Sequence, residues 1–335
     1  MSRLLILSLA LTTLWANVSL AQDSYPQRPQ TLAVIDELVE QEGFNKEQLV
    51  ALFAKVEFKQ SIIDAMSRPA EKTKPWYDYR KIFVTDQRAR EGLAFYATHK
   101  ETFDRAERDT GVPAEVILSI IGVETYYGRI TGSYRVIDAL STLAFDYPKR
   151  SVFFTSELKH FLILARDQGV DPLSLKGSYA GAMGYGQFMP SSYRAYAVDF
   201  DGDDHIDIWN NPVDAIGSVA NYFVQHGWKS GESVVVPAQV TQEVSDEIFN
   251  KGLKPSKTLA EYAQMGIRGA QKQLPPLDPN SMVTAIQFET QEGNKHWLGL
   301  HNFYVITRYN HSAMYAMSVH QLSQDLAAQV AQAAK

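Results

Sequence analysis

Hydrophobic positions recur at helical spacing through the first two thirds of the chain. Within residues 31–42 apolar side chains fall every three or four positions, and Gly43 follows as the expected helix end. A second helix is expected from Asn45, where Gln48 stands three residues later as the partner of a capping box. The same periodicity predicts further helices over residues 85–109, 111–128, 151–168 and 211–227, and a last one from about Ser312.

The pattern changes after residue 230. Residues 233–237 and 281–288 are rich in β-branched and aromatic side chains, and the stretch between them is rich in Gly, Pro and Lys. We therefore expect a small mixed β insertion over residues 231–295, with only helices and loops before it. The polar, proline-bounded stretch 67–75 is expected to be a connecting loop.

Glu124 lies on the apolar stripe of the helix expected over residues 111–128. Ile117, Ile120 and Ile121 precede it by seven, four and three residues, so the four side chains share one face. Burial disfavours the carboxylate anion and raises its pKa, which is the condition that a general acid needs near neutral pH. The alternative is a helix-end glutamate that turns toward solvent or pairs with an arginine.

Composition limits the classes of partner. The 335 residues are enough for two or three domains, and 45% hydrophobic residues suit a globular protein with a substantial core. The net charge of −6 and the lack of a basic run exclude nucleic acid and anionic membranes as expected partners.

The first 21 residues predict an export signal. Arg3 precedes the apolar run 4–11, and residues 19–21 are small enough for cleavage before Gln22. An uncleaved anchor is the alternative, although the run is short for a membrane span. The chain has no cysteine, so its stability must come from the core, with a bound metal as a further candidate source. A lipid anchor on a signal-peptide cysteine is excluded.

A glycine-rich segment over residues 177–190 predicts a sugar-binding cleft. Its four glycines let the backbone approach a ligand closely, while Tyr179, Tyr185 and Phe188 offer flat faces. It lacks a lysine and any phosphate-loop spacing. The alternative is a tight turn packed between helices.

An aspartate-rich loop over residues 199–210 resembles an EF-hand loop and predicts bound Ca²⁺. Its acidic positions one, three, five and nine are followed by a closing carboxylate expected from the next helix, and position seven is expected to give its backbone carbonyl. Asp204 replaces the usual glycine at position six and can adopt the left-handed conformation. The alternative is a solvated acidic turn. The expected ligands are Asp199, Asp201, Asp203, His205 and Asp214.

Five segments together resemble the lytic murein transglycosylase B family, in a soluble form without a lipoprotein cysteine. They are residues 121–128, 181–193, 199–210, 214–222 and 307–312. The aspartate loop is one residue longer, at Asn210 and Asn211, than the family pattern. The resemblance implies a mainly α (α+β) fold with a lysozyme-like catalytic core. It also implies cleavage of the MurNAc-β-1,4-GlcNAc bond of peptidoglycan without water, which leaves 1,6-anhydro-MurNAc ends.

The resemblance further implies that Glu124 is the sole catalytic carboxylate. It would act first as acid and then as base, while the N-acetyl oxygen of the substrate stabilises the charge at C1. Arg150 matches a basic position that meets peptide or lactyl carboxylates, and Lys149 stands where an arginine is expected. The residues implied to bind substrate, which could otherwise be ordinary core aromatics and loop residues, are Ser178, Gln187, Tyr222, Tyr309, Asn310, Tyr315, Arg150 and Tyr79.

The expected layout is a signal peptide at 1–21, an N-terminal helical domain at 22–75, the catalytic core at 76–230, a small β domain at 231–295 and a return to the core at 296–335. The protein is expected in the periplasm, soluble after signal cleavage, with structural Ca²⁺ and no organic cofactor. Its expected partners are glycan strands, with wall-synthesis enzymes as further candidates and no integral membrane segment. Two other functions stay open, a muramidase that uses water and a noncatalytic calcium-dependent wall-binding protein.

Overall fold

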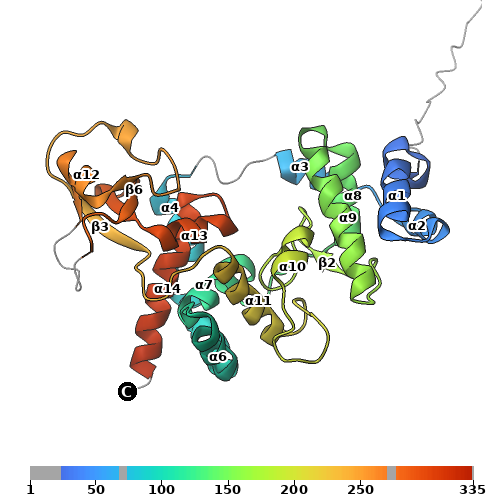
Figure 1. Ribbon diagram of the computed structural model, residues 1–335, viewed down its shortest axis with the longest axis horizontal. Coiled ribbons are helices and arrows are strands. Elements are labelled where there is room, and N and C mark those ends of the chain that lie inside the picture. Colours follow the sequence, from blue (N-terminus) through green and yellow to red (C-terminus); the bar gives the residue numbers. More distant parts are fainter. Residues whose placement is uncertain (1–23, 68–73, 270–276, 334–335) are drawn as a thin grey trace, which may run out of the picture. The chain divides into compact units, whose positions relative to one another are not determined.

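The computed structural model describes residues 24–67, 74–269 and 277–333, which divide into two compact units after Lys55 (Figure 1). The described part of the first unit contains the 3₁₀ helix η1 (Tyr25–Gln27) and the helices α1 (Pro29–Glu42) and α2 (Lys46–Phe53). Gly43 ends α1 with a left-handed φ of 69°, and the Asn45 side chain accepts a hydrogen bond from the Gln48 backbone N–H at 2.9 Å. Both predicted helices, the glycine end of α1 and the Asn45 N-cap are confirmed, and the return bond of the predicted capping box from the Gln48 side chain stays a prediction.

The second unit is built on α7 (Ala114–Thr125), a helix with ten buried residues among its twelve. Such a helix is apolar all round and needs neighbours on every side. It packs against α5, α6, α11 and α14. The other helices of this unit are α3 (Gln60–Ser67), α4 (Trp76–Phe83), α5 (Asp86–Thr98), α6 (Lys100–Thr110), α8 (Val136–Asp146), α9 (Ser151–Asp167), α10 (Pro190–Tyr196), α11 (Pro212–Gln225), α13 (His301–Tyr309), α14 (Ala313–Ala333) and the 3₁₀ helix η2 (Pro148–Arg150).

Two predictions for this unit were wrong. The helix expected over 85–109 is interrupted at His99, whose ring lies 4.6 Å from the Phe95 ring in a tilted arrangement. Phe95 also stacks on Tyr127 at 5.8 Å. The expectation of helices and loops alone before residue 230 also fails. Strands β1 (Tyr134–Arg135) and β2 (Lys176–Gly177) form an antiparallel pair, which is too short to leave an alternating pattern.

The β domain contains a five-stranded sheet in the order β4-β6-β7-β3-β5. All its strand pairs are antiparallel, so the expected mixed insertion is corrected, and its hairpin extends beyond residue 295 to Gly299. Helix α12 packs against β4, β5 and β6. The elements are β3 (Val235–Val240), η3 (Asp246–Ile248), β4 (Lys257–Thr258), α12 (Leu259–Gln264), β5 (Ile267–Gly269), β6 (Met282–Thr290) and β7 (Gly293–Gly299).

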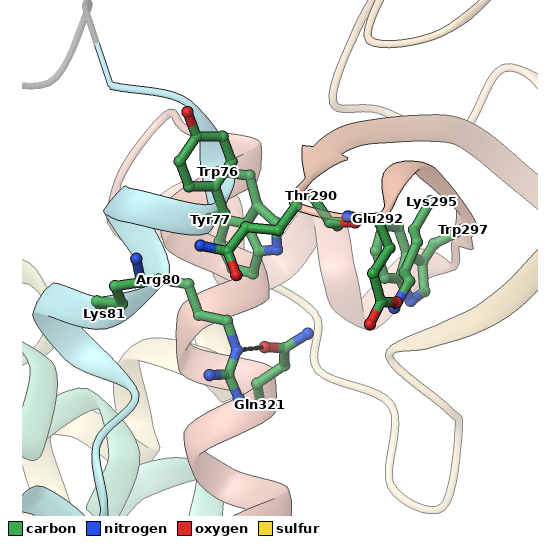
Figure 2. A pocket seen from close by; sticks show the side chains of 10 residues that line it. Trp76, Tyr77, Arg80, Lys81, Thr290, Glu292, Lys295, Trp297 and Gln321 are labelled. Carbon is green, nitrogen blue, oxygen red and sulfur yellow. Dashed lines mark hydrogen bonds and ion pairs between the residues drawn. The ribbon is translucent and has the colours of Figure 1, made fainter.

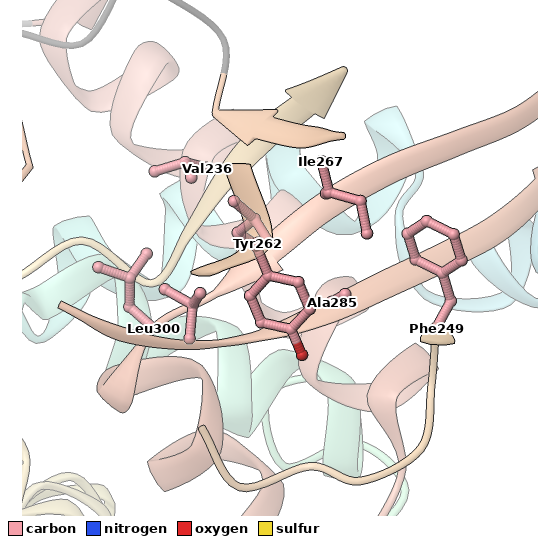
Figure 3. Close-up of a cluster of buried hydrophobic side chains, with 8 residues drawn as sticks. Val236, Phe249, Tyr262, Ile267, Ala285 and Leu300 are labelled. Carbon is pink, nitrogen blue, oxygen red and sulfur yellow. The ribbon is translucent and has the colours of Figure 1, made fainter. Parts of the chain in front are cut away.

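The sheet has a hydrophobic cluster of its own (Figure 3). Tyr262 from α12 packs there with side chains from both long strands, and Phe249 closes the cluster from the connecting segment. Burial of these side chains is the main force that holds the domain together. The buried members are Val236, Phe249, Tyr262, Ile267, Val283, Ala285, Leu298 and Leu300.

Asn302 ties the two ends of the β domain to each other. Its side chain is fully buried, accepts from the Lys229 backbone N–H at 2.9 Å, and donates to the carbonyls of Lys229 and Glu232 at 2.8 and 2.9 Å. The chain therefore leaves and re-enters the helical core at one fixed point. A second link joins α4 to β6, where the rings of Trp76 and Phe288 stack at 4.8 Å.

Some predictions fall outside the described residues. These are the export signal at residues 1–21 and most of the loop predicted at 67–75. Among the helices that the structure does describe, none combines the length and apolar character needed to cross a membrane.

We expect acid to destabilise the protein through His320 on α14. Burial lowers the pKa of its imidazole from 6.5 to about 4. The unfolded chain takes up this proton near pH 6.5 and the folded protein only near pH 4, so stability is lost as the pH falls through that window. From this residue the free energy of unfolding should fall by about 1–3 kcal/mol between pH 7 and pH 4.5. In urea unfolding, the free energy of unfolding of His320→Gln should not show this decrease between pH 7 and pH 4.5. An equal decrease in the wild type and the variant would contradict the role of His320.

Candidate functional site

Glu124 stands on the last turn of α7, where the chain reverses direction. Tyr126, Tyr127 and Gly128 follow with left-handed φ angles of 54°, 60° and 83°. This conformation is uncommon for residues other than glycine and concentrates at functional sites. Glu124 is half-buried between the buried Val123 and Thr125, so it lies at the edge of the core rather than in bulk solvent.

Glycines make room for the rings of this turn. A Cβ at Gly122 would lie 2.7 Å from the Tyr127 ring, and a Cβ at Gly128 would lie 2.0 Å from the Tyr185 ring. The Tyr127 hydroxyl donates to the Arg88 carbonyl at 2.9 Å. The turn after Glu124 is therefore fixed by ring packing that a larger side chain at either glycine would prevent.

Two tyrosines from the C-terminal helices complete the surroundings of Glu124. The Tyr315 hydroxyl donates to Glu124 Oε1 at 2.6 Å, and the Tyr309 hydroxyl donates to the Gly186 carbonyl at 2.6 Å. Burial, and next the negative charge of Glu124, raise the pKa of both phenols well above the usual value. Both therefore stay protonated and act as neutral hydrogen-bond donors.

The glycine-rich segment forms a folded loop beside these residues. Bridges pair Met183 with both Gly177 and Phe188. Thr125 joins the loop to α7, because its hydroxyl lies 2.9 Å from the Tyr185 carbonyl and accepts from the Gly128 N–H at 3.0 Å. The prediction of Phe188 as an exposed sugar face was wrong, because Phe188 is buried against Tyr222 and Tyr309.

Gln187 and Ser178 both lie in this loop, as predicted from the motif. Gln187 adopts a left-handed φ of 50°, and its side-chain amide donates to the carbonyls of Thr131 and Gly184 at 3.1 and 3.0 Å. The Ser178 hydroxyl accepts from the backbone N–H groups of Ala180 and Ala182. Both side chains therefore hold the loop, and contact with a sugar stays a prediction for each.

The structure joins several other predicted residues to this cluster. The rings of Tyr222 and Tyr309 lie 4.6 Å apart, and the Tyr222 hydroxyl donates to the Arg308 carbonyl. Tyr79 is only 1% exposed, and a contact between its ring and a sugar stays a prediction. Asn310 is half-buried at the end of α13, between Tyr309 and the turn into α14.

Arg150 is not brought to the Glu124 cluster by any described contact. Its guanidinium lies over the rings of Phe153 and Phe154 at 4.4 and 5.1 Å, at the start of α9. Lys149 and Arg150 are both exposed there. A role for Arg150 toward substrate carboxylates therefore stays a prediction.

The aspartate loop brings three of its predicted ligands together. One carboxylate oxygen each from Asp199, Asp201 and Asp203 lies within 4.8 Å of the others. Asp204 has a left-handed φ of 69°, as the substitution for glycine at position six requires. Such a cluster of hard oxygen ligands suits Ca²⁺ better than a softer metal.

Asp214 differs from its expected role as closing ligand. It is fully buried, and its two carboxylate oxygens each accept a backbone N–H at 2.8 Å, from Phe200 and from Asp207. Burial raises the pKa of this carboxyl group, and the nearby Asp201 and Asp199 add to the rise. In this structure Asp214 holds the loop backbone, and His205 contributes a backbone N–H that donates to Asp203 at 2.9 Å.

Sequence reasoning missed the residues that attach the loops. Arg105 on α6 donates to the Phe200 carbonyl at 2.5 Å and lies over the Phe200 ring at 3.9 Å. The side-chain oxygen of Gln168 accepts from the Ile206 N–H at 3.1 Å. These links join segments that are far apart in the chain, so no local pattern indicates them. Of these attaching residues, only Thr125 could have been suspected from the sequence, because it directly follows Glu124, the candidate catalytic residue.

Comparison with known proteins gives a family match over nearly the whole chain. Residues 27–324 match the family model described as a transglycosylase SLT domain. The membrane-bound lytic murein transglycosylase B of Escherichia coli (strain K12) is 43% identical over 320 residues, which are 93% of this chain and 86% of that protein.

Solved structures share the architecture. Soluble lytic transglycosylase SltB1 from Pseudomonas aeruginosa has a TM-score of 0.86 and 55% identity, covering 90% of this chain and 100% of that one. Escherichia coli lytic transglycosylase Slt35 in complex with calcium has a TM-score of 0.82 and 43% identity, covering 90% and 94%. SltB3 from Pseudomonas aeruginosa in complex with NAG-anhNAM-pentapeptide has a TM-score of 0.79 and 29% identity, covering 91% and 80%.

We expect the link from Thr125 to the glycine-rich loop to contribute measurably to stability. Thr125→Val keeps the shape of the side chain but leaves the Gly128 N–H and the Tyr185 carbonyl without this partner. The free energy of unfolding should fall by about 1–3 kcal/mol, since an unsatisfied buried group costs its desolvation. Thr125→Ser keeps the hydroxyl and is the matched control. Equal stability of the Val and Ser variants in urea unfolding would contradict the role.

Proposed function

Because the chain belongs to the transglycosylase SLT domain family, we propose that it cleaves peptidoglycan between MurNAc and GlcNAc with Glu124 as acid and then base. Membership makes it a lytic murein transglycosylase with a lysozyme-like fold, as the sequence predicted. We propose, in addition, which bond is cleaved, which product forms and which role each residue has. The hydrogen bond between Tyr315 and Glu124 is the observation that carries it.

In the first step Glu124 gives its proton to the glycosidic oxygen while the C1–O bond breaks. The half-buried position keeps the carboxyl at the edge of the core, where it can meet the glycosidic oxygen. As the carboxylate forms, the short hydrogen bond from Tyr315 stabilises its negative charge. The N-acetyl oxygen of the same sugar stabilises the positive charge that develops at C1.

In the second step the carboxylate of Glu124 takes the proton of the muramyl 6-hydroxyl as that oxygen attacks C1. The new C1–O6 bond gives the 1,6-anhydro end, and Glu124 returns to its protonated form without water entering the reaction. The ligand of SltB3, NAG-anhNAM-pentapeptide, supports this product for the family. Retaining hydrolases use two carboxylates about 5 Å apart, whereas Tyr309 and Tyr315 beside Glu124 are neutral phenols.

We also propose that the aspartate loop binds structural Ca²⁺ through Asp199, Asp201 and Asp203. Their clustered carboxylates repel one another, and a cation there removes that repulsion. The calcium complex of Slt35 supports the assignment. His205 and Asp214 stay candidate ligands, and the geometry favours Asp214 as a buried brace.

Export through residues 1–21 and action in the periplasm belong to the same proposal. The family's murein substrate supports this location. Wall-synthesis enzymes stay candidate partners. The domain limits at 75 and 230 stay predictions, whereas the hairpin of β6 and β7 continues past the expected limit at 295. Hydrolysis by water and binding without cleavage remain the competing functions, and the product analysis that follows separates both from the transglycosylase reaction.

We expect Glu124→Gln to abolish cleavage of peptidoglycan sacculi. Glutamine keeps the size of the side chain but cannot donate an acidic proton, so the rate should fall by about 10²–10⁴-fold. Tyr315→Phe, which removes only the hydrogen bond, should lose about tenfold, corresponding to about 1.4 kcal/mol. Mass spectrometry of the products should find anhydro ends.

Reducing MurNAc ends from the wild type would instead indicate hydrolysis by water. A Glu124→Gln protein as fast as the wild type would remove Glu124 from the mechanism. A folded wild type that binds sacculi without releasing fragments would indicate a binding protein.

We expect Ca²⁺ to raise the melting temperature. Saturation at a hundred times the dissociation constant should stabilise the folded state by about 2.7 kcal/mol. Asp203→Asn removes one ligand charge but keeps the acceptor for His205, and it should reduce the Ca²⁺-dependent rise. Glu243→Gln removes an exposed acid outside the loop and should leave the rise unchanged. A melting temperature that does not respond to Ca²⁺ or to chelator would contradict the site.

A further inference from the structure

A cavity of about 300 Å³ lies between α4, the hairpin of β6 and β7, and α14 (Figure 2). On the helix side, Arg80 donates to the side-chain oxygen of Gln321 at 2.6 Å. On the hairpin side, Glu292, Lys295 and Trp297 face it across the cavity. None of these lining residues belongs to the group around Glu124, so the cavity has no role in the proposed chemistry.

The cavity walls are fixed by aromatic packing. The ring of Trp76 is stacked on Phe288 at 4.8 Å with an interplanar angle of 21°, and Trp76 is only 4% exposed. Trp297 packs against the same Phe288 at 5.7 Å. One buried phenylalanine therefore positions a tryptophan from the helix and a tryptophan from the hairpin. A rigid pocket of this kind loses little entropy when a ligand enters.

The lining is positively charged, although the whole chain is acidic. Arg80, Lys81 and Lys295 contribute three positive charges and Glu292 one negative charge, which gives +2 against a chain total of −6. The two lysines are engaged in exposed pairs, Lys81 with Asp78 at 3.2 Å and Lys295 with Glu292 at 2.8 Å.

Arg80 differs from the two lysines because its guanidinium donates to the neutral side-chain amide of Gln321 and not to a carboxylate. Within the described residues, no carboxylate lies within salt-bridge distance of its guanidinium, although its charge acts on Asp325 further along α14. A guanidinium presents several N–H donors in a planar fork, and this geometry matches a carboxylate. The guanidinium of Arg80, with the rings of Trp76 and Trp297 nearby, favours a ligand that carries a carboxylate on a short carbon chain.

We propose that this cavity is an accessory site for a carboxylate of the peptide attached to the glycan, with Arg80 as its main ligand. The assignment rests on the proposed function, which supplies a glycan-linked peptide as substrate. Such a peptide is part of the ligand in the SltB3 complex, NAG-anhNAM-pentapeptide. The volume suits one or two residues of that peptide.

Helix α14 contributes a residue to both the Glu124 cluster and the cavity. Gln321 follows Tyr315 by six residues on α14, which is about 9 Å along the helix axis. Arg80 directly follows Tyr79 on α4. An extended pentapeptide spans about 17 Å, so a peptide attached to a sugar near Glu124 can reach the cavity.

The test compares two substrates, glycan strands that carry their peptides and strands from which an amidase has removed them. Arg80→Gln should raise KM for the peptide-bearing strands about tenfold and leave kcat unchanged, as expected for loss of one charge-assisted hydrogen bond. It should leave both constants unchanged on peptide-free strands. Lys295→Gln, which alters only an exposed pair, should raise KM about threefold in the same selective way. Arg108→Gln, at an exposed arginine on α6, is the matched control and should change neither substrate.

Equal effects of Arg80→Gln on the two substrates would show a structural role and overturn the proposal, as would no effect on either. Lys295→Gln tests the same cavity without disturbing the fold, because exposed ion pairs contribute little to stability. Calorimetric binding of NAG-NAM-pentapeptide to the Glu124→Gln protein gives an independent measurement. There Arg80→Gln should weaken binding about tenfold. If the wild type cleaved neither substrate, the proposed function would fail, while this binding measurement would still decide the accessory site.

Discussion

The site depends on how α7 ends. A helix buried on all sides can supply only its last turn to a ligand, and the left-handed residues Tyr126 and Tyr127 turn the chain away directly after Glu124. The tight contact of the Tyr127 ring with Gly122 fixes this turn. The carboxyl group is thus held at the edge of a rigid core, and the core's packing limits how far it can move.

The remaining parts of the site come from distant segments that meet at this helix end. Thr125 attaches the glycine-rich loop, and that loop's Gly186 carbonyl accepts the hydroxyl of Tyr309. Tyr315 comes from the chain that has returned through the β domain, which Asn302 anchors at both ends. The β domain therefore contributes to the site by fixing where α13 and α14 begin.

The sequence predicted the parts of this arrangement that local physics determines. Gly43 and Asn45 mark helix boundaries because capping acts over a few residues, and Asp204 could be assigned a left-handed conformation for the same reason. Helix α8 was missed because nine of its eleven residues are buried, so its sequence lacks an amphipathic stripe. The buried position of Phe188 depends on rings more than thirty residues away, and no local pattern carries that information.

The phenols beside Glu124 explain how one carboxyl group can serve in both proposed steps. A second carboxylate beside Glu124 would repel the anion that forms after the first proton transfer. Tyr309 and Tyr315 avoid this, because their raised pKa values keep them neutral while Tyr315 still donates to Glu124. Burial of the two rings therefore has a chemical consequence as well as a structural one. In the proposed mechanism Glu124 loses and regains one proton while Tyr309 and Tyr315 keep theirs.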